Sequence, residues 1–179
     1  DPSQVDISRL LDSGTDGNAD TGFQPTGNCV CTTGNPFVVN SNTTEQFCSI
    51  QDAIDAPSTL AGHTILVSSG TYDEQVVINK GVILQGTGAT KPVIDFTGTP
   101  STTGAFSSPA KRPLFLVTVP NVTIDNFEFQ VDLTKLSSAI LATGSNVDDL
   151  DIKNNDINPY KSTPDSYVGG YSDRNAISI

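Results

Sequence analysis

Oxygen-bearing side chains alternate with glycines near the start of the chain, in a pattern that suits a Ca²⁺ loop. The segment DSGTDGNADTG holds them at regular spacings: Asp12, Asp16, Asn18 and Asp20. The match to a Ca²⁺ loop is degenerate, because Gly14 takes a ligand position and no Glu closes the loop. A flexible acidic linker is the interpretation we favour, and a weak Ca²⁺ site on these four residues is the alternative.

Cys29, Cys31 and Cys48 are the three cysteines of the chain, so they cannot all pair within it. The spacing of Cys29 and Cys31 is shorter than in the usual zinc knuckle, and no second Cys pair with His partners follows. We therefore expect a disulfide from Cys29 or Cys31 to Cys48. Such a bridge would tie the start of the chain to the folded part and is typical of an oxidising, extracellular compartment.

The composition excludes several classes of partner. The chain of 179 residues has 9 Lys and Arg against 20 Asp and Glu, which gives a net charge of −11. This charge repels nucleic acid, and it would repel acidic polysaccharides unless bound Ca²⁺ bridged the two. No stretch approaches the ~20 apolar residues of a membrane span, so we expect no membrane insertion.

Residues 1–35 are rich in Asp, Gly, Thr, Asn and Pro. We predict an irregular N-terminal extension there and one folded domain over 36–179. The first elements of this domain would be a strand in NPFVVNSN and a short capping helix near 49–56. Ser49 suits the N-cap of that helix, with Asp52 three positions further on.

From residue 64 onward the sequence consists of brief apolar stretches bounded by Gly, Asn, Asp or Pro. They are TILV, EQVVIN, GVILQG, PVIDF, LFLVTV, NVTIDNFEF, SAILA, DLDIKNNDI and NAISI. Nearly all alternate apolar and polar residues with a period of two, which predicts β-strands. The fold class predicted from these stretches is all-β.

Two of the stretches superimpose with an offset of 28 residues, the separation of Val122 and Leu150. The alignment places apolar residues on apolar residues and Asn126 on Asn154, and residues 82–86 fit the same frame one repeat earlier. A repeat of this length built from strands and turns predicts a solenoid, here a parallel β-helix whose coils lie ~4.8 Å apart. Asn126 and Asn154 would then form an asparagine ladder in a turn.

The run CSIQDAIDAPSTLAGHTILVSSGTYDEQVVINKGVILQGTGA, residues 48–89, resembles the N-terminal cap and first coil of right-handed β-helix proteins of the pectin-lyase-like superfamily. The shared pattern is an S/T-I-Q-x-A-I helix followed by G-x-T-I-x-V, G-T-Y-x-E and I-x-K-x-[LV]-x-[LI]-x-G. The resemblance implies a right-handed coil, which agrees with the usual handedness of parallel crossovers. It implies no single activity, because the superfamily includes lyases, hydrolases, adhesins and phage spikes.

Polysaccharide lyases with this fold hold Ca²⁺ on outward carboxylates and use an Arg or Lys to remove the proton alpha to a uronate. The resemblance therefore makes Asp125, Asp151, Lys153 and Arg174 candidates for a Ca²⁺-dependent site. The alternative is that Asp125 and Lys153 form an ion pair between coils, worth under ~1 kcal/mol. We favour the ion pair, because one basic residue lies near the acids and the Asn-Thr-Asp and His-Gly motifs of related hydrolases are missing.

Three small or aliphatic residues near the end of the sequence belong to the last predicted strand: Ala176, Ile177 and Ile179. No capping helix follows them, and an uncapped solenoid end exposes backbone hydrogen-bonding groups and apolar core. We therefore expect either a longer β-helix or a partner at this end. If the partner were a second copy, head-to-tail filaments would grow.

Two Asn-X-Thr triplets begin at Asn42 and Asn121. They are N-glycosylation acceptors only in a host that glycosylates. The chain begins at Asp1 without a Met or an apolar leader, which we interpret as a mature secreted chain whose signal peptide has been removed.

These observations favour a non-catalytic β-helix module with an extracellular or cell-surface location. Its function would be structural or adhesive, through self-association or contact with surface glycans or proteins. A Ca²⁺-dependent polysaccharide lyase or related carbohydrate-active enzyme is the alternative function.

Overall fold

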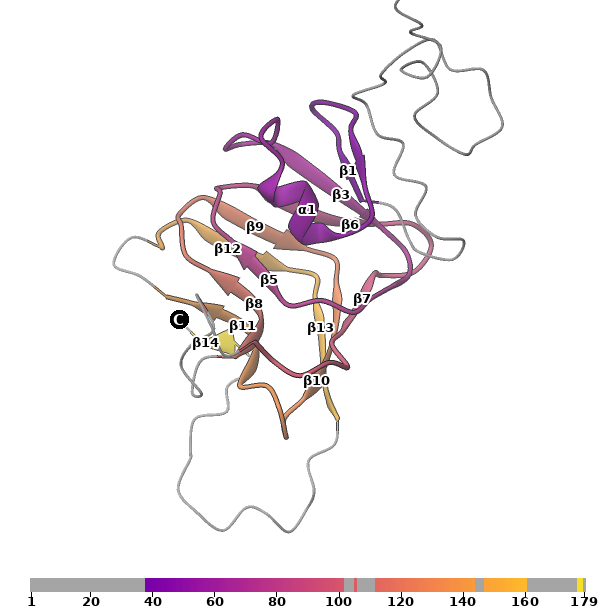
Figure 1. The fold of residues 1–179 in the computed structure, drawn as a ribbon, viewed down its shortest axis with the longest axis vertical. Coiled ribbons are helices and arrows are strands. Elements are labelled where there is room, and N and C mark those ends of the chain that lie inside the picture. Colours follow the sequence, from indigo (N-terminus) through magenta and orange to yellow (C-terminus); the bar gives the residue numbers. More distant parts are fainter. Residues whose placement is uncertain (1–37, 102–104, 106–111, 144–146, 161–176, 179) are drawn as a thin grey trace, which may run out of the picture.

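The computed structural model describes residues 38–101, 105, 112–143, 147–160 and 177–178. The predicted irregular extension over residues 1–35 lies outside these ranges. The described part is mostly β structure, as the sequence predicts, with one short helix (Figure 1).

The strands are short and follow one another closely. Their bounds are β1 Val38–Asn40, β2 Gln46–Phe47, β3 Thr64–Ser68, β4 Thr71–Tyr72, β5 Val76–Ile78, β6 Ile83–Thr87, β7 Val93–Asp95, β8 Pro113–Val117, β9 Val122–Asp125, β10 Glu128–Asp132, β11 Ser138–Ala142, β12 Leu150–Lys153, β13 Asp156–Tyr160 and β14 Ile177–Ser178. The helix α1 covers Ile50–Asp55.

The strands form three sheets, and from β3 onward the chain visits these sheets in turn. The strand orders are β12-β9-β6-β3-β1-β2, β13-β10-β7-β4 and β14-β11-β8-β5 (Figure 1). Neighbouring strands in each sheet are therefore three apart in chain order, and they pair in parallel. The exception is β1, which pairs antiparallel with both β2 and β3.

The pairing register confirms the alignment of the repeats. Leu150 lies opposite Val122 and Ile152 opposite Ile124, with the offset of 28 residues that the sequence indicates. One strand earlier, Leu84 lies opposite Ile124. Because the side-chain period of a strand is two, this register keeps the same apolar columns on the buried side in successive strands.

Two stretches that the sequence predicts as single strands are each divided into two strands in the structure. The stretch NVTIDNFEF divides into β9 and β10 at Asn126, and DLDIKNNDI divides into β12 and β13 at Asn154. Both asparagines have left-handed backbone conformations, with φ of 66° and 55°. Asn tolerates this region better than most residues, so the chain turns there into the next sheet.

The helix α1 begins and packs as the sequence predicts. Ser49 is its N-cap, and the Ser49 hydroxyl accepts a hydrogen bond from the Asp52 N–H at 3.0 Å. Ile50, Ala53 and Ile54 are fully buried against the core. The helix therefore covers the end of the core next to β1, β3 and β5 (Figure 1).

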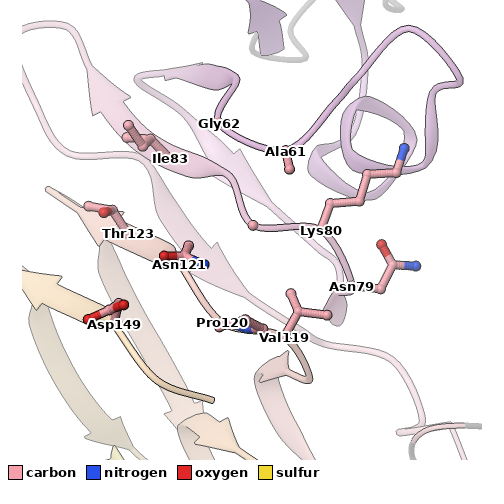
Figure 2. A pocket seen from close by; sticks show the side chains of 11 residues that line it. Ala61, Gly62, Asn79, Lys80, Ile83, Val119, Pro120, Asn121, Thr123 and Asp149 are labelled. Atoms are coloured by element: carbon pink, nitrogen blue, oxygen red, sulfur yellow. The ribbon is translucent and has the colours of Figure 1, made fainter. Parts of the chain in front are cut away.

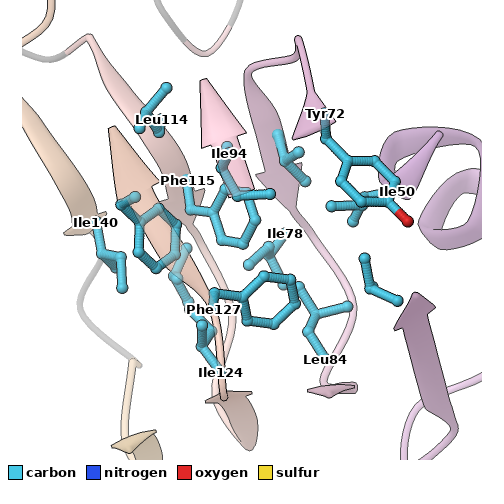
Figure 3. Packing of buried hydrophobic residues seen from close by; sticks show 14 of the residues in the cluster. Ile50, Tyr72, Ile78, Leu84, Ile94, Leu114, Phe115, Ile124, Phe127 and Ile140 are labelled. Atoms are coloured by element: carbon cyan, nitrogen blue, oxygen red, sulfur yellow. The ribbon is translucent and has the colours of Figure 1, made fainter. Parts of the chain in front are cut away.

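The core is one apolar cluster that receives side chains from all three sheets. Three aromatic rings lie at its centre, because Phe115 packs edge-on against Phe127 and Phe129 with ring centroids 5.8 and 5.0 Å away. Figure 3 shows Phe115 and Phe127 among aliphatic side chains such as Ile78 and Ile124. Burying a large apolar side chain of this kind contributes about 1.5–3 kcal/mol.

Candidate functional sites

Asp125, Asp151 and Lys153 lie together on the outward side of β9 and β12, as the alignment predicts. Lys153 Nζ lies 2.8 Å from Asp151 Oδ2 on the same strand. Asp125 Oδ1 instead accepts a hydrogen bond from Asn154 Nδ2 at 2.8 Å. The predicted ion pair between Asp125 and Lys153 is therefore wrong: the ammonium group of Lys153 contacts Asp151, while the Asp125 carboxylate bonds to the Asn154 amide.

The environment of Lys153 does not suit a general base. The hydrogen bond and charge of Asp151, with a smaller effect from Asp125, raise the pKa of Lys153 above its usual value. A lysine that removes a proton needs the opposite shift, towards neutral pH. Arg174, the other basic candidate, lies outside the described residues.

The described ranges hold no group of three or more His, Cys, Asp or Glu side chains placed to bind a metal ion. The predicted Ca²⁺ loop of Asp12, Asp16, Asn18 and Asp20 lies outside these ranges. The possible Ca²⁺ site there stays a prediction.

Asn126 and Asn154 occupy equivalent corners, but their side-chain amides do not bond to each other. Asn126 Nδ2 donates to the carbonyl of Gly86 at 2.9 Å, while Asn154 Nδ2 donates to Asp125. The next residue, Asn155, also connects neighbouring coils: its Oδ1 accepts from the Phe127 N–H and its Nδ2 donates to the Ile124 carbonyl, both at 2.8 Å. The asparagines at these corners therefore join the coils through separate bonds and not through a ladder of bonds between Asn126 and Asn154.

A half-buried carboxylate holds the start of α1. The two oxygens of Glu74 accept hydrogen bonds from the backbone N–H groups of Ile50 and Gln51, at 2.8 and 3.1 Å. These N–H groups belong to the first turn and have no partner within the helix. Glu74 lies in the segment that follows β4, so it joins the first coil to the helix that covers it.

Two other side chains complete this covered end. Gln51 bonds to the backbone of Val77 in both directions, since its Oε1 accepts from the Val77 N–H and its Nε2 donates to the Val77 carbonyl. Lys80 Nζ donates to the carbonyls of Ala56 and Thr59, at 2.9 and 3.0 Å. Lys80 therefore holds the chain just after α1.

The lone histidine has structural contacts as well. His63 Nδ1 accepts a hydrogen bond from the Leu60 N–H at 3.3 Å and lies 3.1 Å from Asn40 Nδ2. Both neighbours are nitrogen donors, so Nδ1 acts as an acceptor. These contacts fix the turn that leads into β3, so His63 has a structural role.

Glu74 makes the stability of the protein depend on pH. Burial, opposed by the two N–H donors, raises the pKa of Glu74 above its usual value. The Glu74 carboxyl group therefore binds its proton more tightly in the folded state than in the unfolded state. As a result, the contribution of Glu74 to stability falls as pH rises from about 4 towards 7. We expect Glu74→Gln to lower the free energy of unfolding by about 1–3 kcal/mol at pH 4, and by less at pH 7.

Urea unfolding at both pH values measures this difference. The control is Asp148→Asn, which removes one negative charge at an exposed position and is expected to have little effect at either pH. If the loss of unfolding free energy caused by Glu74→Gln were larger at pH 7 than at pH 4, the folded state would favour the carboxylate form of Glu74. A raised pKa of Glu74 in the folded state would then be wrong.

The remaining predicted site residues lie at the boundaries of the described ranges. Cys48 is half-buried immediately before the N-cap of α1, and its predicted partners, Cys29 and Cys31, lie outside. Ile177 belongs to β14 and lies opposite Ile140 of β11. The other two residues of the predicted assembly end, Ala176 and Ile179, lie outside.

An open pocket of about 810 Å³ lies at the amino ends of β6, β9 and β12, where successive turns stack (Figure 2). Ile83, Asn121, Thr123 and Asp149 are among its lining residues. Asn121 and Asp149 both have positive φ, 58° and 57°, so the same corner recurs in two successive coils. No pattern in the sequence predicts this pocket, although Asn121 belongs to one of the Asn-X-Thr triplets.

No family model matches the chain, and no solved structure matches it either. A segment of 52 residues is 44% identical to part of a protein named cell surface glycoprotein from Methanothermus fervidus. This segment is 29% of the present chain and 9% of that protein, so the similarity covers a small part of the relative. In the described ranges, no helix is long and apolar enough to cross a membrane.

Proposed function

We propose that the chain is a right-handed parallel β-helix that serves as a non-catalytic structural or adhesive module of a secreted or cell-surface protein. The observation that supports this most is the continuous core, to which strands of all three sheets contribute buried side chains. In a solenoid each coil packs only against its neighbours, so such a core joins successive coils into one body. The handedness follows from the resemblance and from the general preference of parallel crossovers.

Two further observations support this function. The outward charged residues are engaged by neighbouring side chains: Lys153 pairs with Asp151, and Asp125 accepts a hydrogen bond from Asn154. Such contacts suit the outer wall of a stack, since they join neighbouring coils or residues of one strand. The partial similarity to a protein named cell surface glycoprotein supports the proposed location.

The location is tested by labelling intact cells that make the protein with an amine-reactive reagent that cannot cross membranes. Lys153 should react, because about half of its side chain is exposed (48%). Labelling of Lys153 in intact cells, with known cytoplasmic proteins unlabelled, is the expected result. Labelling only after lysis would contradict a surface location.

A Ca²⁺-dependent polysaccharide lyase is the second candidate, favoured only by the outward grouping of Asp125, Asp151 and Lys153. The raised pKa of Lys153 counts against it. We expect no cleavage of polyuronate by the intact protein with or without Ca²⁺, and no change in surface binding in Lys153→Ala. Cleavage that needs Ca²⁺ and disappears in Lys153→Ala would establish the lyase instead.

The proposal includes self-association. The contact would be made through the end of the stack formed by β12, β13 and β14. Each of these strands is the last of its sheet in the described part of the chain. Ile152 and Ile157 are half-buried there, while Ile124 and Phe129, their partners one coil earlier, are fully buried. A partner that covered this side would complete the burial of these side chains.

Head-to-tail filaments would need the opposite end of the stack to accept strands. That end is covered by α1, and Gln51 already bonds to the backbone of β5. We therefore propose that two copies pair through the end formed by β12, β13 and β14, and that filaments do not grow. Electron microscopy of the native protein should show pairs, and long filaments would contradict this form of assembly.

A further inference from the structure

Two asparagines of Asn-X-Thr triplets lie on exposed turns at the same end of the six-stranded sheet. Asn42 follows β1 in the turn towards β2, and Asn121 directly precedes β9. Both are exposed. An acceptor for a glycan must be reached by an enzyme from outside the folded or folding chain, and exposed turns allow this.

The hydrogen bonds of these asparagines leave their amide nitrogens free. Asn42 uses its Oδ1 to accept a hydrogen bond from the Thr64 N–H at 2.8 Å. Asn121 is held through its backbone N–H, which donates to the Asp148 carbonyl at 3.0 Å. Within the described part of the chain, neither Nδ2 has a hydrogen-bond partner, so a sugar attached there would break no existing bond.

The third residue of each triplet supplies a hydroxyl next to the acceptor. Thr123 is an outward residue of β9, and it lines the pocket together with Asn121 (Figure 2). Thr44 has a left-handed backbone conformation, with φ of 63°. A β-branched residue is rare in that region, where Gly or Asn would fit more easily, so the turn itself does not explain a threonine at this position.

We propose that Asn42 and Asn121 are N-glycosylation sites. In the transfer, Nδ2 of the asparagine forms a bond to C1 of the first sugar of a lipid-linked oligosaccharide donor. The bond between C1 and the phosphate oxygen of the donor breaks, the lipid phosphate leaves with the bonding electrons, and Nδ2 releases one proton to a base. The step involves no change of oxidation state. The proposal rests on the proposed location outside the cytoplasm.

The two glycans would cover one surface. Asn42 bonds to the first residue of β3, and Asn121 leads into β9, with β6 between these strands. Between two and three strand spacings, about 10–15 Å, therefore separate the levels of the two sites. The pocket lies along this edge, and its Ile83 side chain is 37% exposed. A glycan on Asn121 would lie over Ile83 and remove this apolar surface from water.

The test is mass spectrometry of peptides from the protein purified from the cells that make it. Lys80 lies between the two sites, so trypsin places them on different peptides. The expected result is a hexose-containing mass on each peptide, located on Asn42 and on Asn121. Unmodified peptides from protein recovered at the cell surface would overturn the proposal. Recovery of the protein only from the cytoplasm would contradict the proposed location instead, so the two failures are distinguishable.

Variants made in the same cells test the role of the hydroxyls. Thr44→Val and Thr123→Val keep the β-branched shape but remove the hydroxyl, and each should abolish the glycan at its own site while leaving the other occupied. Thr44→Ser and Thr123→Ser are the matched controls, and they should retain the modification. Equal occupancy in the Val and Ser variants would show that the sugar is not attached through these triplets.

Discussion

Phe115→Ala is expected to lower the free energy of unfolding by about 3–5 kcal/mol, the usual cost of removing a buried aromatic side chain. Phe115 is fully buried and makes edge-on contacts with Phe127 and Phe129. Phe115 and Phe129 come from different sheets, since Phe115 lies in β8 and Phe129 in β10, and Phe127 lies in the turn between β9 and β10. The substitution therefore leaves a cavity where the sheets meet, and the neighbouring strands can close it only in part.

Chemical denaturation measures the loss, with Ile83→Ala as the control. Ile83 is also a large apolar residue of a strand, but it points outward and is 37% exposed. Its truncation should cost much less than that of Phe115. Equal losses for the two variants would mean that Phe115 does not lie in a closely packed core.

Gly86→Ala is expected to be the second most damaging substitution, with a loss of about 3 kcal/mol or more, at or above the upper end of the range for overpacking. A Cβ atom on residue 86 would lie 2.0 Å from the carbonyl oxygen of Asn126 and 2.7 Å from Cδ of Pro92. The first of these contacts is with the backbone of the next coil, which cannot rotate away as a side chain can. The Gly86 carbonyl also accepts the hydrogen bond from Asn126 Nδ2, so the clash would disturb that corner as well.

Gly81→Ala gives a graded comparison for this prediction. Its Cβ atom would lie 2.8 Å from the Pro120 carbonyl oxygen, a milder approach to the same neighbouring coil. Thermal unfolding should show a smaller loss for Gly81→Ala than for Gly86→Ala. If Gly86→Ala were as stable as the wild type, the coils would not be stacked as closely as described.

Much of the fold could be predicted because its signals are local. Ser49 and Asp52 mark the start of α1, and the alternation in residues 122–125 and 150–153 marks paired strands with the correct register. The strand division at Asn126 was missed, because an asparagine in a strand-like pattern does not reveal its φ. The two-residue strand β4 was missed because Gly70 and the polar residues around it resemble a turn.

The side-chain contacts of the candidate sites were predicted less well, because they depend on which residues the fold brings close together. Lys153 has two acids within reach, and only the structure shows that Asp151 is its partner. Glu74 and Lys80 have ordinary sequence contexts, yet both bond to the backbone of the covering helix segment from more than 20 residues away. Side chains that satisfy a helix end across this separation leave no pattern in the sequence.

The most direct test of the central claim, one continuous stack covered by α1 at one end, is hydrogen exchange of individual backbone amides in the native protein. Strands β6, β8, β9 and β10 are paired on both sides, and their amides should exchange most slowly. The Val77 amide should also be protected, although β5 is the last strand of its sheet, because Gln51 accepts its hydrogen bond. Rapid exchange at the Val77 amide would contradict a stack that is covered at the α1 end.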